Sequence, residues 1–178
     1  MMKQKHINLA IALCLIVLAI SLRILPHPAN FAPVAAVAIF GGAILPRRLA
    51  IWTPVAAMAA SDLVIGLHNL VALTWGCYAL IALASSYFLK KPSFKRGLAL
   101  TISGSLFFFF VTNFAVWLWG GMYERTWAGL IQCFTMAIPF FRNTALSDLI
   151  YTGALFGAYF AAIRLSARLS KQSLVKNT

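Results

Sequence analysis

The chain has 178 residues, of which 62% are hydrophobic and 10% charged, and a soluble domain of this length cannot hide so much apolar surface from water. The net charge of +12 would suit nucleic acid, but the basic residues stand in short clusters between apolar runs, and no nucleic-acid recognition motif accompanies them. The composition therefore predicts an all-α, polytopic membrane protein with no nucleic-acid partner.

Several apolar runs approach the roughly 20 residues needed to cross a hydrocarbon core about 30 Å thick. The first run is followed by Pro26 and Pro28 and by no small-residue cleavage site, so a spanning helix is expected there instead of a signal peptide. The segment 128–138 is too short to span and is expected to form a short helix that lies at the interface or folds back into the protein. The whole chain, 1–178, is predicted to form a single transmembrane domain. Its six predicted spans are 7–25, 33–46, 49–67, 70–89, 97–119 and 143–167.

Six spans place both termini on one side, and the basic residues then segregate strongly. Twelve of the fifteen lie on the side of the termini, and three, Arg23, Arg125 and Arg142, lie on the other. This bias follows the positive-inside rule, so both termini are expected to be cytoplasmic. The twelve are Lys3, Lys5, Arg47, Arg48, Lys90, Lys91, Lys95, Arg96, Arg164, Arg168, Lys171 and Lys176.

Four spans carry a polar group at a similar depth, roughly 8–12 Å below the outer surface at 1.5 Å per residue. Polar and ionisable groups inside a membrane are costly and usually functional. Their common level predicts a pocket open to the outside, bordered by polar and aromatic residues of the outer loops such as His27. The four groups are Asp62, Cys77, Asn113 and Asp148.

Each of these residues also has a purely structural explanation. Asp62 would accept a hydrogen bond from a neighbouring helix, Asp148 would pair with Arg142, and Asn113 would bond between helices. Cys77 would be a small buried hydrophobe, as is expected of Cys14 and Cys133.

Motifs of enzymatic chemistry are absent from the sequence. There is no GxxxxGK[ST] phosphate loop, no HExxH, no GxSxG and no CxxC. The few carboxylates stand in different segments, so no acid/base pair follows from their spacing. Binding is the expected activity.

Four stretches resemble a bacterial family of six-helix membrane proteins related to the substrate-binding S components of energy-coupling-factor (ECF) vitamin transporters. They are "NFAPVAAVAIFGGA", "SDLVIGLHN", "VTNFAVWL" and "AIPFFRNTALSDLIY". A cysteine early in the fourth span resembles the cobalamin-specific, BtuM-like subfamily, in which a cysteine thiolate is an axial ligand of the corrinoid cobalt. The resemblance implies Cys77 as the cobalt ligand. His27, Asp62, Tyr78 and Arg142 are candidates for lining the same pocket from their depth and loop position.

The resemblance implies uptake of cobalamin or a related corrinoid across the bacterial inner membrane, with no intrinsic cofactor. The ligand would be captured at the outer face and released inward by tilting of the protein in the bilayer, and loss of cyanide from cyanocobalamin would be a side reaction. An energy-coupling module, made of a transmembrane coupling subunit and two ATPases, is the implied partner, although the first span lacks the AxxxA face found in many S components. Two alternatives stay open: an S-component-like transporter of another vitamin or small molecule, and a membrane thiol enzyme or structural subunit.

Overall fold

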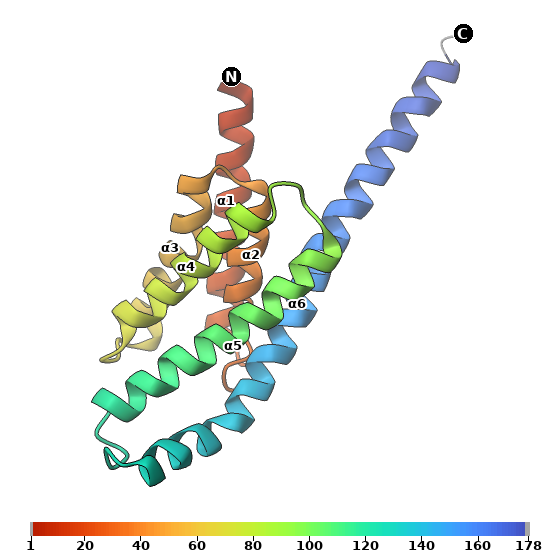
Figure 1. Cartoon of the computed structure of the whole chain (residues 1–178). Helices are drawn as coiled ribbons and strands as arrows, with labels where there is room; N and C mark the ends of the chain where they lie inside the picture. Colours follow the sequence, from red (N-terminus) through yellow and green to blue (C-terminus); the bar gives the residue numbers. More distant parts are fainter. Residues whose placement is uncertain (1, 177–178) are drawn as a thin grey trace.

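The computed structural model describes residues 2–176, with side chains described for 4–168, and this part of the chain consists of helices and the segments that connect them (Figure 1). Five of its helices are long and apolar enough to cross a membrane, and the remaining apolar helix has 11 residues. The predicted all-helical membrane fold is confirmed, with five helices of spanning length in place of six. The helices are α1 (Met2–Ile24), α2 (Val34–Ile44), α3 (Arg47–Ile65), α4 (Val71–Phe88), α5 (Phe94–Trp119) and α6 (Trp127–Lys176).

The short helix α2 forms the centre of the bundle. Every residue from Val34 to Gly42 is buried, and α2 contacts all five other helices. A helix that is hydrophobic on all sides is typical of such a buried position. At 1.5 Å per residue it is about 16 Å long, roughly half of a hydrocarbon core. The segment predicted as the second span is therefore a core helix.

The prediction of a separate short helix over 128–138 is wrong. These residues form the first part of α6, which continues through Pro139 for 50 residues in all. Figure 1 shows α6 changing direction between its teal and light-blue parts, near this proline. A proline removes one backbone donor and bends a helix, but the helix can continue where its neighbours support it.

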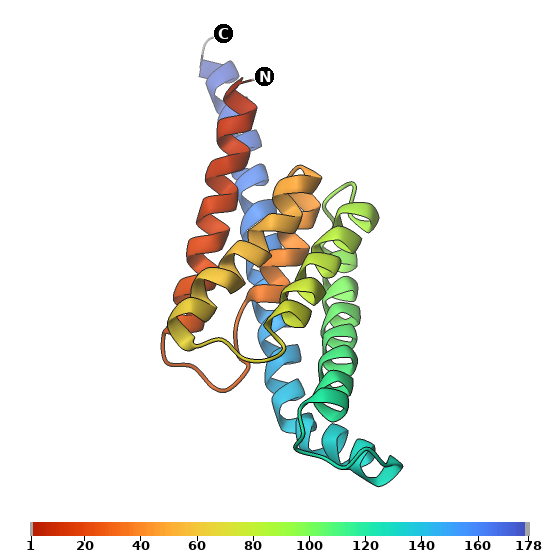
Figure 2. The same ribbon diagram turned by 90° about the vertical axis from the view of Figure 1, so that its left-hand side faces the viewer.

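Both termini lie at the same end of the bundle (Figures 1 and 2). We call this the terminal end, and it also holds the connections at 45–46 and 89–93. The opposite, distal end holds the connections at 25–33, 66–70 and 120–126. Which end faces the cytoplasm stays a prediction.

The outward faces of the helices carry large apolar side chains. Val17, Trp52 and Leu63, for example, are 61%, 66% and 76% exposed. Exposed apolar surface on this scale is a liability in water, whereas lipid tails solvate it. Among the described side chains, every buried nitrogen or oxygen has a hydrogen-bond partner. These features are those of a multi-pass membrane protein.

Gly42 allows α2 and α4 to approach closely. A Cβ atom at Gly42 would lie 2.5 Å from Ser85 Cβ and 2.7 Å from the Ala82 carbonyl oxygen. Beside this contact, Ser85 Oγ donates a hydrogen bond to the Ile39 carbonyl oxygen at 2.6 Å. The core helix therefore depends on a residue without a side chain at this position.

We expect Gly42→Val to lower the melting temperature of the detergent-solubilised protein, because overpacking a core costs about 1–3 kcal/mol. Gly157→Ala is the control, since a Cβ atom at Gly157 meets nothing within 4 Å. Thermal unfolding followed by circular dichroism measures both variants. A Gly42→Val protein as stable as the wild type would contradict the close packing of α2 against α4.

Candidate functional site

Two adjoining cavities open at the distal end of the bundle. The first has a volume of about 530 Å³ and lies among α1, α2, α3, α4 and the distal loops, with α5 and α6 on its far wall. The second, of about 330 Å³, lies mainly between α5 and the first half of α6. Both volumes fall within the range of small-molecule sites. The residues that line both cavities are Asn30, His68, Thr74, Phe108 and Thr144.

Arg23 forms part of the wall of the first cavity and is held there by α3. Its Nη2 donates to Asp62 Oδ1 at 2.8 Å, and its Nη1 donates to Ser61 Oγ at 2.7 Å. The other carboxylate oxygen of Asp62 accepts from Trp75 Nε1 at 2.7 Å. Asp62 is 1% exposed and lines neither cavity. Its carboxylate therefore ties α1, α3 and α4 together, as the structural explanation predicts.

Asp148 is hydrogen-bonded to Ser105, whereas the sequence suggested a pair with Arg142. Its Oδ2 accepts from Ser105 Oγ on α5 at 2.6 Å, and it is 2% exposed. Arg142 is exposed at the distal end and lines neither cavity, and it forms no ion pair with Asp148. Asp148 therefore fastens α6 to α5, together with the hydrogen bond from Thr101 Oγ1 to Thr152 Oγ1 at 2.9 Å.

Cys77 lies on the buried face of α4, between two residues that line the first cavity. Thr74 precedes it by about one turn and Tyr78 follows it directly, and both side chains line that cavity. Cys77 is 2% exposed and lines neither cavity. The ring of Tyr78 stacks on Phe108 of α5, with centroids 4.8 Å apart. The thiol is thus next to the cavity wall but not part of it.

Two histidines of the distal loops line the first cavity in different ways. His27 holds its own loop, with Nδ1 at 2.7 Å from the Pro28 carbonyl oxygen and Nε2 at 3.0 Å from the Arg23 carbonyl oxygen. His68 Nδ1 accepts from the Leu70 amide at 3.2 Å, which leaves Nε2–H as a donor for a ligand.

The predicted site residues therefore separate into two groups. His27 and Tyr78 line the first cavity, and Asn113 lines the second, although its amide also donates to the Phe109 carbonyl oxygen at 2.7 Å. The others lie outside both cavities. These are Asp62 and Asp148, buried in contacts between helices, Cys77, buried on α4, and Arg142, exposed.

Two threonines that line both cavities, Thr74 and Thr144, are not among the residues predicted from the sequence. Thr74 stands one turn before Tyr78, and Thr144 stands one turn before Asp148. The i, i+4 spacing from predicted residues was the signal that could have found them, because such residues share a helix face.

The sequence matches a family of unknown function, DUF6580, over residues 3–171. The chain belongs to this family. The DUF6580 match includes α1 to α5 and most of α6, so both cavities and the Arg23–Asp62 pair lie within it. No curated protein and no solved structure matches the chain.

We expect Asp62→Ala to destabilise this DUF6580 protein strongly. The change removes the carboxylate that accepts from Arg23 and from the Trp75 indole N–H. Breaking a buried ion pair in this way costs up to about 3–5 kcal/mol, and Arg23 keeps its hydrogen bond to Ser61. The double variant Arg23→Leu/Asp62→Leu removes both charges and should recover part of the loss. Melting temperatures in detergent make the comparison.

Asp148→Ala is the matched control, because this carboxylate is equally buried but has no basic partner among the described side chains. Its melting temperature should fall less than that of Asp62→Ala. If Asp62→Ala were as stable as the double variant, the ion pair would not be what holds the three helices.

Proposed function

We propose that this protein is a membrane-embedded binding component that takes up a small molecule through its distal end. The observation that carries the proposal is the pair of adjoining cavities, which open between helices away from the termini. Their walls carry hydroxyl, amide, imidazole and aromatic groups, as in sites that hold an organic ligand by few polar contacts. No enzymatic motif competes with this function.

The direction of uptake follows from charge. Twelve of the fifteen basic residues belong to segments at the terminal end. By the positive-inside rule that end faces the cytoplasm, in this proposal the cytoplasm of a bacterium. The cavities then open to the outside of the inner membrane, where a nutrient is captured. An energy-coupling module of a transmembrane subunit and two ATPases is the partner that the resemblance implies.

Cobalamin or a related corrinoid is the ligand we propose first. The support is the BtuM-like position of Cys77 on α4, directly before the cavity residue Tyr78. Among the described side chains, no three His, Cys, Asp or Glu residues gather as a metal site. A corrin fills the equatorial positions of cobalt itself, so a single soft thiolate is enough as a protein ligand. Because Cys77 lies outside the cavity wall, ligation requires the side chains around it to rearrange.

A second candidate is an S-component-like transporter of another vitamin or small molecule. The burial of Cys77 away from both cavities favours it, since the thiol would then be core packing. The ligand would be held by His68, Asn30 and the threonines that line both cavities.

The visible spectrum of the purified protein tests the cobalamin proposal. We expect added hydroxocobalamin to co-elute with the protein in gel filtration and to show the altered spectrum of a cobalt–thiolate bond. Cys77→Ser should reverse the spectral change. Cys14→Ser is the matched control that should retain it, because Cys14 is exposed on α1 and lines neither cavity.

Failure to bind hydroxocobalamin would overturn the corrinoid proposal and leave the second candidate, which growth rescue with a panel of vitamins would test. Binding with the same spectrum in Cys77→Ser would remove the thiol from its role as ligand. Thr144→Phe fills the space shared by the two cavities. It should abolish binding of the ligand that the wild type binds, whether this is hydroxocobalamin or the vitamin identified by growth rescue. Unchanged binding in Thr144→Phe would place the ligand elsewhere.

A further inference from the structure

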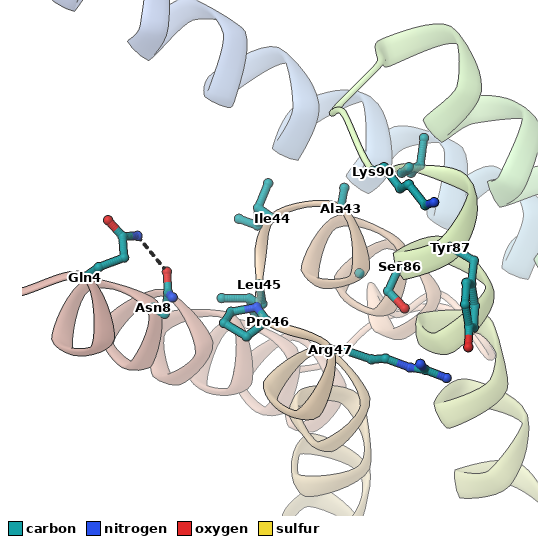
Figure 3. A pocket seen from close by; sticks show the side chains of 12 residues that line it. Gln4, Asn8, Ala43, Ile44, Leu45, Pro46, Arg47, Ser86, Tyr87 and Lys90 are labelled. Atoms are coloured by element: carbon teal, nitrogen blue, oxygen red, sulfur yellow. Dashed lines mark hydrogen bonds between the residues drawn. The ribbon is translucent and has the colours of Figure 1, made fainter. Parts of the chain in front are cut away.

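A polar pocket at the terminal end has a composition unlike that of the two distal cavities. It has a volume of about 330 Å³ and lies where the start of α1, the α2–α3 connection and the end of α4 meet. Arg47 and Lys90 supply its charges, and Gln4, Asn8 and Ser86 supply neutral polar groups (Figure 3). None of the lining residues is acidic.

No acidic side chain in the described part of the chain balances the positive charge of this pocket. The chain has three acidic side chains, Asp62, Glu124 and Asp148, and none belongs to a segment at the terminal end. The Arg47 guanidinium lies over the Tyr87 ring, 4.4 Å from its centroid. In the view of Figure 3, the Lys90 and Arg47 side chains extend to the same side, above and below this ring. The pocket is therefore suited to an anion from outside the chain.

An apolar groove begins at the same tyrosine. It has a volume of about 710 Å³ and runs between α4 and α5, with Ile39 of α2 at its base. On α4 it extends from Phe88 back to Leu80, about 12 Å at 1.5 Å per residue. This length is most of one leaflet of a hydrocarbon core about 30 Å thick. Tyr87 lines both the groove and the polar pocket.

We propose that this surface holds one anionic phospholipid, with its phosphate between Arg47 and Lys90 and an acyl chain in the groove between α4 and α5. Basic pockets between membrane helices are suited to anionic headgroups. The amphipathic ring of Tyr87 lies where headgroup and tail join, the level that tyrosine prefers in membranes. The continuity of a cationic pocket with an apolar groove selects a lipid over a free anion, which has no use for the groove.

The test uses the full chain in nanodiscs made from equal parts of phosphatidylglycerol and phosphatidylcholine. Native mass spectrometry after release in detergent measures which lipid the protein retains. The wild type should retain phosphatidylglycerol in preference. Arg47→Gln/Lys90→Gln should lower the ratio of the two retained lipids by about tenfold or more.

Arg164→Gln is the matched control, because it removes a basic residue at the same end that lines neither the pocket nor the groove. It should leave the ratio unchanged. Ser103→Phe fills the groove and should lower retention of phosphatidylglycerol with both basic residues intact. Three results would each overturn the proposal: an unchanged ratio in the double variant, full retention in Ser103→Phe, or displacement of the lipid by an equal concentration of glycerol phosphate, which would mark a site for free anions.

Discussion

The buried carboxylate of Asp62 is the constraint on which the distal half of the molecule depends. A carboxylate inside a membrane is tolerable only when it is paired and hydrogen-bonded. Both oxygens of Asp62 are used, one by Arg23 of α1 and one by Trp75 of α4. Because Arg23 is also a wall of the first cavity, the same contact positions the last turn of α1 and the loop that carries His27 and Asn30. The ion pair therefore supports both the packing of the helices and the wall of the first cavity.

A second set of polar contacts holds together α5, α6 and the first distal loop, on the side of the cavities away from Asp62. Ser105 and Asp148 join α5 to α6, and Asn143 Nδ2 donates to the Ala29 carbonyl oxygen in the first distal loop at 3.0 Å. The cavities lie between these contacts and the Asp62 network, so a ligand there touches helices of both groups. Phe108 and Thr144, which line both cavities, come from the α5–α6 side. The site is thus a boundary between two hydrogen-bonded groups of helices.

Hydropathy predicted most of the helix bounds within three residues, because lipid demands long apolar runs. It could not separate a span from a core helix at α2, since both are apolar throughout, nor show that α6 continues through Pro139. Depth along a helix placed Asn113 and Asp148 at one level. It carried no information on direction around the helix axis, which separates the cavity residue Asn113 from the buried Asp148. The pairing of Arg23 with Asp62 spans 39 positions and follows only from the packing of α1 on α3.

The charge distribution differs between the two ends of the molecule. At the distal end, Asp62 neutralises Arg23 inside the protein, so the polar groups of the cavities are free to contact a ligand. At the terminal end, segments 1–8, 45–48, 89–96 and 164–176 contain no acidic side chain, and their counter-ions must come from solution or from lipid. The high net charge thus has a physical explanation without nucleic acid. In the proposed topology it orients the chain in the bilayer and attracts anions to the pocket around Arg47 and Lys90, which lies beside an apolar groove.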